Sequence, residues 1–267
     1  MTVSPETLRL VSFGLVLGLM ALWELRAPAR VLVEGRHPRW LTNFSFALID
    51  TVVLRLVLPA GALGAASYAE TLDFGLLRLV DLSPFVMGVL GFLLLDLAIY
   101  GQHVVFHKVP VLWRIHAVHH ADRDLDVSSG LRFHPLEALL SMGLKMIVVF
   151  VLGVPVIAVF VFEVVLNAAA QFNHSNVTLP ARIERFLRWM IVTPEMHRTH
   201  HSIDPKETDT NFGFFLSIWD RVFGLYTAEP ARGREGLILG LAEHQTHGPS
   251  WLVWSILLPF RKGRRSA

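Results

Sequence analysis

The chain has 267 residues, of which 53% are hydrophobic and only 17% are charged, and its mean hydropathy is +0.49. A soluble domain carries about 25% charged residues, so this composition indicates a membrane protein and argues against a soluble enzyme. The chain has no cysteine, which excludes disulfides, thiolate zinc sites, iron–sulfur clusters and thiol nucleophiles. The net charge is only +2 and the basic residues lie near expected membrane edges, so we interpret them as orientation signals and not as a nucleic-acid surface.

Apolar stretches predict an all-α integral membrane protein with about four transmembrane helices, since a span needs about 20 mostly apolar residues. Three candidate spans are 8–25, 44–66 and 84–102. Two shorter stretches, 135–153 and 155–172, are separated by a turn signal at Gly153-Val154-Pro155 and predict a helical hairpin that spans or re-enters the membrane. Residues 249–260 are too short to span and contain two tryptophans, so we expect an interfacial helix there.

Loop charges predict the orientation of these helices. The first loop carries four arginines, whereas the loop 67–83 has only Arg78, so the positive-inside rule places the first loop in the cytoplasm. Counting spans from there brings every histidine cluster to the cytoplasmic face, and the basic tail agrees: Arg261, Lys262, Arg264 and Arg265. Ala27-Pro28-Ala29 resembles a signal-peptidase site, but the segment before it lacks a basic start, so we expect an uncleaved first helix.

Histidines are concentrated in one part of the chain: ten of the thirteen fall between His103 and His201. They form an H-x3-H motif (His103, His107), two H-x2-H-H motifs (His116, His119, His120 and His197, His200, His201) and a single His174 after Asn173. Residues three and four apart share one helical face, so each cluster can direct two or three imidazoles at one point. Imidazole binds iron, zinc, copper or nickel. One metal rarely needs more than four protein ligands, so eight or nine candidates predict two metals in a histidine-rich helical cap.

The third span carries a stripe of polar residues on one helical face, in steps of four, three and four: Asp96, Tyr100, His103 and His107. A metal-bound histidine usually donates its other N–H to a carboxylate or a carbonyl. We therefore predict that Asp96 or Tyr100 orients His103. The alternative is that Asp96 pairs with a neighbouring helix, for example through Arg55.

The second arm of the hairpin repeats this arrangement with Glu163, Asn167 and His174, spaced four and seven residues apart. We predict that Glu163 and Asn167 support the same centre; the alternative for Glu163 is a hydrogen bond between helices. His134 has three interpretations, as a ligand, as a donor that supports a ligand, or as a residue that starts a helix.

An all-nitrogen pair of sites fits iron that activates dioxygen, and it also fits zinc. A site at the membrane face beside apolar helices has access to hydrocarbon, and unactivated C–H bonds need an oxidant, which favours iron. Two alternatives are a zinc-dependent membrane hydrolase and a metal-binding membrane protein without catalysis.

Taken together, the motifs resemble those of the fatty acid hydroxylase and sterol desaturase superfamily, and most of all its bacterial sterol desaturase family proteins. In chain order they are Asp96-x3-Tyr100-x2-His103-x3-His107, His116-x2-His119-His120, Leu131-Arg132-Phe133-His134-Pro135-Leu136-Glu137, Asn173-His174-Ser175-Asn176 and Thr193-Pro194-x2-His197-x2-His200-His201-Ser202. Asn211-Phe212-Gly213 and Trp219-Asp220-Arg221-Val222-Phe223-Gly224 follow. The resemblance covers residues 96–226, and the joint set is highly specific.

The resemblance implies an integral membrane non-haem di-iron oxygenase. The ligands that it implies are His103, His107, His116, His119, His120, His174, His197, His200 and His201. Some members have H-x3-H in the middle motif, but the position four before His174 is Ala170 here. His134, a water or a carboxylate such as Glu163 would then complete the ligand set. Asp220 is expected to pair with Arg221 near the last cluster, or to support a ligand.

These observations predict hydroxylation or desaturation of a lipid (a sterol, a fatty acyl chain or a related molecule) with two iron ions, dioxygen and external electrons. No haem-binding cytochrome motif and no G-x-G-x-x-G flavin fingerprint occurs, so a separate donor is expected, either a ferredoxin or a cytochrome with its reductase. We expect the inner membrane of a bacterium, with the metals on the cytoplasmic side. The predicted organisation is one cooperative unit: transmembrane helices over 1–90, a di-metal region over 91–228, and an interfacial helix with a basic tail over 229–267.

Overall fold

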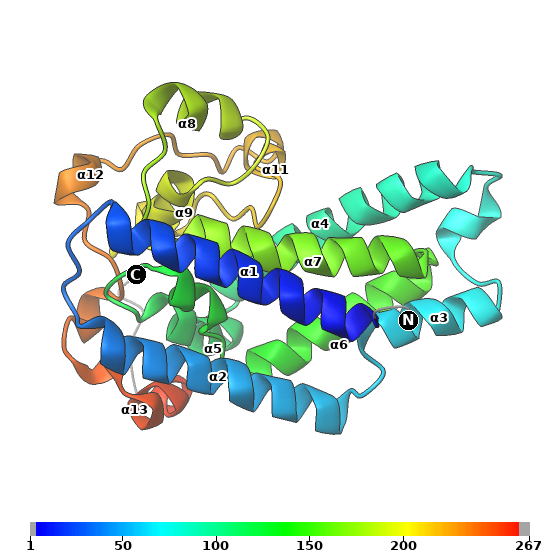
Figure 1. The fold of residues 1–267 in the computed structure, drawn as a ribbon, viewed down its shortest axis with the longest axis horizontal. Coiled ribbons are helices and arrows are strands. Elements are labelled where there is room, and N and C mark those ends of the chain that lie inside the picture. The colour runs from blue at the N-terminus through cyan, green and yellow to red at the C-terminus, as the bar shows by residue number, and fades with distance from the viewer. Residues whose placement is uncertain (1–3, 262–267) are drawn as a thin grey trace.

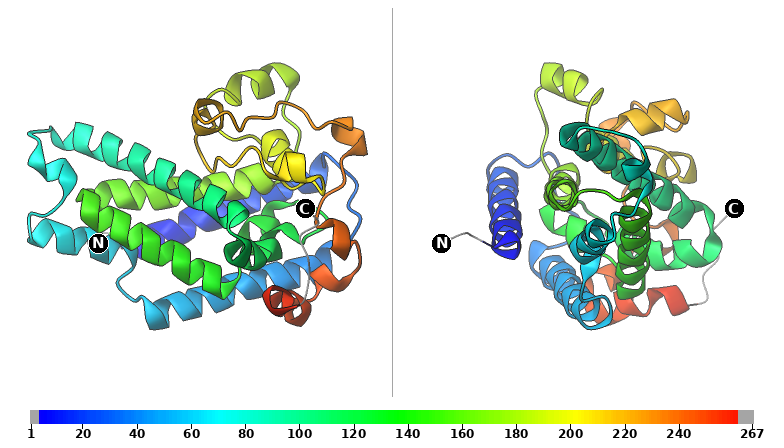
Figure 2. Two further views of the ribbon diagram at one scale, coloured as in Figure 1. Left: turned by 180° about the vertical axis from the view of Figure 1, so that it is seen from behind. Right: turned by 90° about the vertical axis from the view of Figure 1, so that its right-hand side faces the viewer.

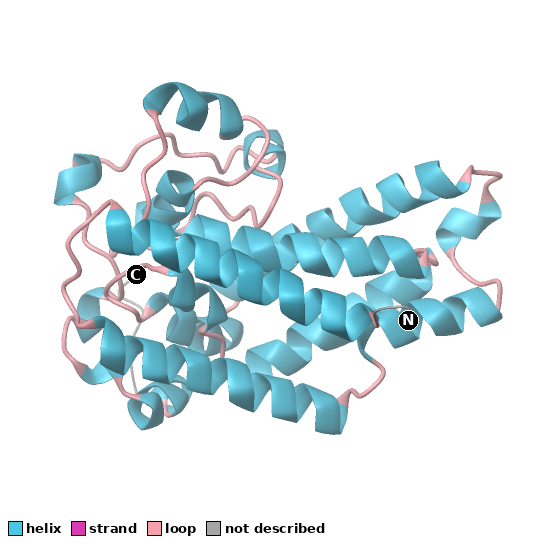
Figure 3. Cartoon of the chain, in the orientation of Figure 1, coloured by secondary structure: helices cyan, strands magenta, loops and turns pink. Residues whose placement is uncertain are grey.

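The computed structural model describes residues 4–261, and within that range the chain is built of helices and loops without a β-strand (Figure 1, Figure 3). The longer helices are α1 (Pro5–Arg26), α2 (Arg36–Val57), α3 (Gly61–Thr71), α4 (Pro84–Lys108), α5 (Pro110–His120), α6 (Pro135–Leu152) and α7 (Val156–His174). The shorter α-helices are α8 (Ala181–Leu187), α9 (Pro194–His200), α10 (Pro205–Thr208), α11 (Ile218–Val222), α12 (Gly233–Gly236) and α13 (Leu252–Ile256). The 3-10 turns are η1 (Leu76–Leu79), η2 (Val127–Leu131), η3 (Ala242–His244), η4 (Gly248–Ser250) and η5 (Leu258–Phe260). The all-helical prediction is confirmed.

Within residues 4–261, five segments are long and apolar enough to cross a membrane: Pro5–Arg26, Arg36–Leu79, Pro84–Lys108, Pro135–Leu152 and Val156–His174. Both arms of the predicted hairpin are therefore full-length helices. Gly153 ends α6 in the left-handed conformation (φ +66°), and its missing side chain allows close approach, since a Cβ there would lie 2.6 Å from the Phe74 carbonyl oxygen.

The predicted span over 44–66 is not one continuous helix. The structure ends α2 at Val57 and starts α3 at Gly61. Pro59 lies in the break, where a proline lacks the N–H that a helix interior needs, and Gly61 adopts a positive φ of 56°. Apolar composition alone could not show this interruption.

Proline sets where several of the remaining helices begin. Pro84, Pro110, Pro135 and Pro194 each occupy the first turn of their helix, where the missing N–H removes no hydrogen bond. The preceding residue often caps the same helix: the Ser83 and Thr193 hydroxyls each accept from the backbone N–H three residues on. His134 does this for α6 through Nδ1, so of its three interpretations the structure selects the helix start.

The long helices lie side by side along the long axis, and the short helices gather at the end where α4 and α7 finish (Figure 1, Figure 2). We call residues 109–134 and 175–261 the cap. An apolar core joins α3, α4, α6 and α7 and includes Leu95, Val149 and Phe162. Large apolar side chains such as Leu15 and Leu56 stay exposed along the helices, as lipid-facing side chains do.

The C-terminal segment forms η4, α13 and η5 against the cap. Trp251, Val253 and Phe260 are exposed, whereas Trp254 packs into a core cluster with Trp113 and Ala117. Apolar side chains are thus exposed over the segment predicted to be interfacial. Of the basic tail, Lys262, Arg264 and Arg265 lie outside the described residues.

A buried ionic network joins α2 to the loop that follows α5. The Arg39 guanidinium, fully buried, donates to Asp122 Oδ1 at 2.7 Å and to Asp126 Oδ2 at 2.6 Å. Arg132, also fully buried, donates to the Val118 carbonyl at 2.8 Å and to Asn43 Oδ1 at 3.1 Å. Arg39 therefore holds the cap on the helices, and this role is separate from its expected one as a loop charge that sets orientation.

Replacement of Arg39 by alanine is expected to lower stability by about 3–5 kcal/mol, because it leaves two buried carboxylates without their cation. The measurement is thermal unfolding in detergent. Arg78→Ala is the matched control: Arg78 pairs with the exposed Asp73, so its loss should cost less than about 1 kcal/mol. Equal melting temperatures for the two variants would contradict the structural role of Arg39.

Candidate metal centre

Five histidines form the first group, which we call group A: His103, His107, His116, His120 and His200. They come from the last turns of α4, from α5 and from α9, and all are buried. Their Nε2 atoms approach one another closely, at 3.1 Å for His103 and His116, 3.1 Å for His107 and His120, and 3.2 Å for His200 and His103. All five ligand atoms lie within 4.8 Å of one another.

Four histidines form the second group, group B: His119, His174, His197 and His201. The Nε2 atom of His174 lies 3.1 Å from that of His119 and 2.9 Å from that of His197. The Nε2 atoms of His197 and His201 are 3.1 Å apart. The structure thus brings together the nine histidines predicted as ligands, in sets of five and four.

Each H-x2-H-H motif contributes to both groups. In α5, His116 and His120 face group A while His119 faces group B; around α9, His200 faces group A while His197 and His201 face group B. The rings of His120 and His201 stack across the boundary, with centroids 4.3 Å apart. Adjacent histidines therefore point in different directions and join the two groups into one centre.

The spacing of the nitrogens fits metal ions. Two nitrogens bound at right angles, each about 2.1 Å from a metal, lie about 3.0 Å apart, which is close to the separations of 2.9–3.2 Å seen here. Five donors exceed the four of a tetrahedral zinc site, so group A suits a metal of higher coordination number. Group A thus offers one candidate donor more than the four protein ligands that a metal usually takes.

Four histidines donate Nδ1–H to a backbone carbonyl. The acceptors are Phe212 O for His103 (2.8 Å), Arg132 O for His119 (3.1 Å), Ala170 O for His174 (2.6 Å) and Thr210 O for His200 (2.8 Å). A proton on Nδ1 leaves the Nε2 lone pair free to bind a metal and fixes the ring direction. Ala170 stands where some family members have a histidine, and its backbone carbonyl orients His174.

Two further histidines lie against carboxylates. Glu137 Oε1 is 2.7 Å from His116 Nδ1, and Asp209 Oδ1 is 3.3 Å from His107 Nδ1. Glu137, which is buried, was not among the predicted site residues. Its place three residues after His134, in the first turn of a helix that starts beside the clusters, was a signal that could have identified it.

Burial keeps His120, His200 and His201 neutral. Removal from water lowers the pKa of His200 to about 3 and the pKa of His120 and His201 well below the ordinary value of 6.5. Neighbouring imidazoles add to this effect. A neutral ring is the form that binds a metal.

Asp220 supports the centre through the backbone. Its carboxylate accepts from the N–H of Phe212 at 2.7 Å and of Gly213 at 3.0 Å, and the Phe212 carbonyl in turn accepts from His103. The expected pairing with Arg221 is replaced by other contacts, because that guanidinium lies over the ring of Tyr226, 3.9 Å from its centroid. Of the two expected roles, the structure favours support of a ligand.

The two predicted stripes do not orient histidines. Asp96 accepts from Trp219 Nε1 at 2.7 Å and from the Leu216 N–H at 3.3 Å, so it holds a cap loop and pairs with neither His103 nor Arg55. The Tyr100 ring stacks on Phe223, with centroids 5.5 Å apart. Asp96 and Tyr100 share a helical face with His103, but the residues that they contact, Trp219, Leu216 and Phe223, belong to the cap.

Glu163 and Asn167 likewise point to other partners. Glu163 pairs with Arg9 at 3.0 Å and with Lys145 at 3.3 Å, which ties α7 to α1 and α6. Asn167 donates to the Glu163 carbonyl within the same helix. Neither Glu163 nor His134 belongs to group A or group B, so neither completes a ligand set.

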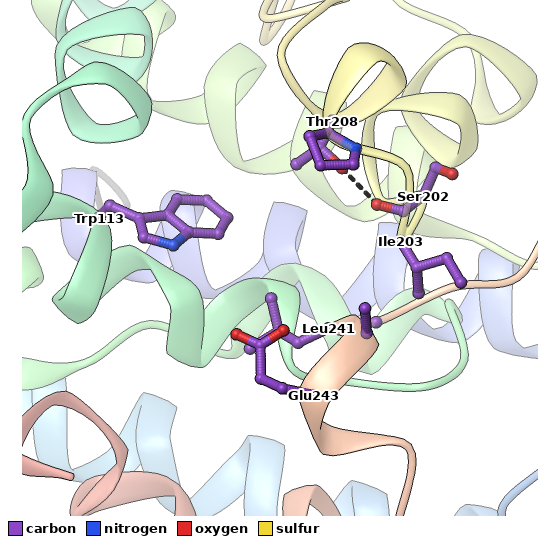
Figure 4. Close-up of a pocket in the computed structure, with 9 residues that line it drawn as sticks. Trp113, Ser202, Ile203, Thr208, Leu241 and Glu243 are labelled. Atoms are coloured by element: carbon purple, nitrogen blue, oxygen red, sulfur yellow. Dashed lines mark hydrogen bonds between the residues drawn. The ribbon is translucent and has the colours of Figure 1, made fainter. Parts of the chain in front are cut away.

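A small pocket opens beside group A (Figure 4). Trp113 lines it together with Ser202, Leu241 and Glu243, and the Trp113 ring centroid is 4.9 Å from that of His107. The Thr208 hydroxyl donates to the Ser202 carbonyl at its wall. The volume of about 40 Å³ admits a water or two and not a lipid chain.

Comparison with known proteins gives a family match. The model of the family described as fatty acid hydroxylase matches residues 88–225. Similar proteins include an ornithine lipid hydroxylase of Rhizobium tropici (32% identity over 53% of this chain), an alkylglycerol monooxygenase of Xenopus tropicalis (30% over 60%) and a human cholesterol 25-hydroxylase (29% over 52%). The matches cover 42%, 35% and 52% of these relatives, so the chain spans about half of their length or less. No solved structure matches the chain.

Replacement of Glu137 by glutamine is expected to weaken metal binding by about 10- to 100-fold, because the amide keeps an acceptor near His116 but removes the negative charge that makes the imidazole a better ligand. Competition with a chelator measures the affinity. Glu243→Gln, at an exposed carboxylate, is the control and should retain the affinity of the wild type. Equal affinities for the two variants would contradict the role of Glu137.

The metal-free protein is expected to lose stability as the pH falls below about 6.5. Histidines in the unfolded chain bind protons in this range, whereas the buried rings of the folded protein do not. The sign follows from the lowered pKa values of His120, His200 and His201, since the unfolded chain binds more protons in this range. Melting temperatures at about pH 7.5 and about pH 5.5 measure the effect, which bound metal should oppose. A flat profile for the metal-free protein would be inconsistent with neutral buried rings.

Proposed function

The chain belongs to the fatty acid hydroxylase family, and on that premise we propose that it is a membrane oxygenase that hydroxylates a lipid at a centre of two iron ions. One observation carries this proposal: nine buried histidines converge in groups of five and four at the end of helices long enough to span a membrane. His103, His107, His116, His120 and His200 would hold one ion. His119, His174, His197 and His201 would hold the other.

The donor set supports iron in preference to zinc. Group A offers five nitrogens, more than the four ligands that tetrahedral zinc takes in all, so these residues would suit an ion of higher coordination number such as iron. Bound iron would supply the activation of dioxygen that breaking an unactivated C–H bond requires. In hydroxylation one oxygen atom enters the lipid and the other leaves as water, with two electrons and two protons consumed.

The protein's own contribution is to hold the nitrogens rigidly and keep water away. Backbone carbonyls fix the rings of His103, His119, His174 and His200, so the donors need no rearrangement when a metal binds. Full burial of the histidines excludes bulk water, which would otherwise compete with a hydrocarbon for the oxidant.

The position of the centre suggests how the lipid arrives. His103, His107 and His174 lie in the last turns of α4 and α7, so the metals would lie at the edge of the bilayer, within reach of a chain that enters from the membrane. The pocket beside Trp113 is too small for this purpose. The end of α1 and the start of α2, which carry Arg26 and Arg36, lie at the cap end of the long helices (Figure 1), and Arg30 donates to the Leu237 carbonyl of the cap. These arginines support placement of the cap on the cytoplasmic side.

The substrate class follows from the relatives, whose names specify an ornithine lipid, an alkylglycerol and cholesterol. Each hydroxylase or monooxygenase among them is named for a lipid, so we propose a membrane lipid for this chain as well. The electrons would come from a separate carrier, a ferredoxin or a cytochrome with its reductase.

His119→Ala and His200→Ala, one from each group, are expected to lose bound metal and lipid hydroxylation together. Metal content is measured on the purified protein, and hydroxylation is measured by mass spectrometry of lipids from cells that produce each variant. The wild type should add one oxygen to a lipid, and both variants should not. His247→Ala, at an exposed side chain, is the control.

Three results would overturn the proposal. The first is a fully active His119→Ala or His200→Ala variant. The second is zinc in the native protein together with hydrolysis that needs neither dioxygen nor reductant. The third is retained iron with no oxygen consumption when reductant and a total lipid extract are supplied.

A further inference from the structure

An exposed apolar surface lies on the side of the cap, over α8, the turn after it and α11. We call it the lateral surface. Its members, between 47% and 66% exposed, are Ile183, Phe186, Trp189, Met190, Ile218, Val222 and Phe223. A cluster of large exposed apolar side chains marks a binding surface in a soluble region, and α8 and α11 belong to no spanning segment.

Several contacts make this surface one unit. The Arg221 guanidinium lies over the Trp189 ring, 4.6 Å from its centroid, and donates to the Arg188 carbonyl at 2.7 Å. The Ser217 hydroxyl donates to the same carbonyl at 2.7 Å. The start of α11 is thereby fixed against the turn that follows α8, so the apolar side chains of α8 and those of α11 form one surface.

The lateral surface is continuous with a membrane-spanning helix. Phe223, at the end of α11, stacks on Tyr100 of α4 with centroids 5.5 Å apart. Tyr100 lies eight residues before the end of α4 at Lys108, which is about 12 Å along the helix axis. The surface therefore sits beside the last turns of the spanning helix, and α8 and α11 stand to one side of the long helices (Figure 1, Figure 2).

The charges around the lateral surface complement lipid headgroups. Arg182 and Arg185 are exposed on α8 next to Ile183 and Phe186, and Trp189 follows. Arginine beside tryptophan and large apolar residues is the composition of helices that lie in the membrane interface, where cations attract anionic headgroups.

We propose that the lateral surface inserts into the membrane interface. Its apolar side chains enter the boundary between headgroups and acyl chains, and Arg182 and Arg185 contact lipid phosphates. This inference does not rest on the proposed chemistry, because it needs only that the long helices span a bilayer.

Insertion would reach the candidate ligands through the start of α9. Glu184 of α8 points inward, where it accepts from the Thr193 hydroxyl at 2.5 Å and pairs with Arg188 at 2.8 Å. Thr193 is the N-cap of α9, the helix that carries His197 and His200. A membrane-anchored α8 thus steadies the start of the ligand helix.

The test uses single cysteines in the full chain, which has none of its own. Phe186→Cys and Val222→Cys carry an environment-sensitive fluorophore after reconstitution into vesicles of phosphatidylcholine and phosphatidylglycerol. Leu15→Cys, exposed on α1, is the lipid-facing reference, and Glu243→Cys, at an exposed polar position in η3, is the aqueous one. Lipids with a nitroxide near the headgroup serve as quenchers.

Labels at positions 186 and 222 are expected to emit at shorter wavelength than the label at 243 and to be quenched by the nitroxide lipids. Emission and quenching equal to those at 243 would place the surface in water and overturn the proposal. A label shielded from water but not quenched by nitroxide lipid would show that protein covers the surface, a second copy or another partner, and would overturn it as well. Unchanged melting temperatures check that each variant is folded.

Discussion

The direction of nine imidazole rings is the constraint on which the rest of the structure depends. Imidazole nitrogens about 3 Å apart repel one another through their lone pairs unless cations lie between them. The protein fixes the opposite side of many of these rings, through carbonyls such as those of Phe212 and Ala170 and through the Glu137 carboxylate. The cap loops are therefore as much part of the centre as the histidines.

A second requirement is that the cap stay attached to the helices that supply His103, His107 and His174. Fully buried ion pairs provide this attachment: Arg39 of α2 binds Asp122 and Asp126 in the loop after α5. Glu24, at the end of α1, accepts from the backbone N–H groups of Val127 and Asn176. Buried ion pairs add little net stability but fix geometry, and a centre that depends on ring directions needs fixed geometry.

Sequence reasoning could predict what depends on local periodicity. It predicted the all-helical fold, the turn at Gly153 and the histidine clusters, because helical spacing and turn chemistry depend on residues close together in the sequence. It could not predict which neighbour a helical face contacts: Asp96 does not orient His103, and Glu163 follows the alternative, a contact between helices. A backbone carbonyl is present at every residue, so the sequence could not show that the Ala170 carbonyl accepts from His174.

The division of each adjacent histidine pair between groups A and B has a consequence for assembly. His119 and His120 share one peptide bond, as do His200 and His201, yet the two members of each pair belong to different groups. In the proposed di-iron centre, an ion held by one group would therefore also restrain the neighbouring histidine of the other group, including His120 and His201, whose rings no backbone carbonyl orients among the described residues. Part of the entropy of ordering these side chains would already be lost when the second ion binds. We expect metal loading to be cooperative, with little of the singly loaded form at equilibrium.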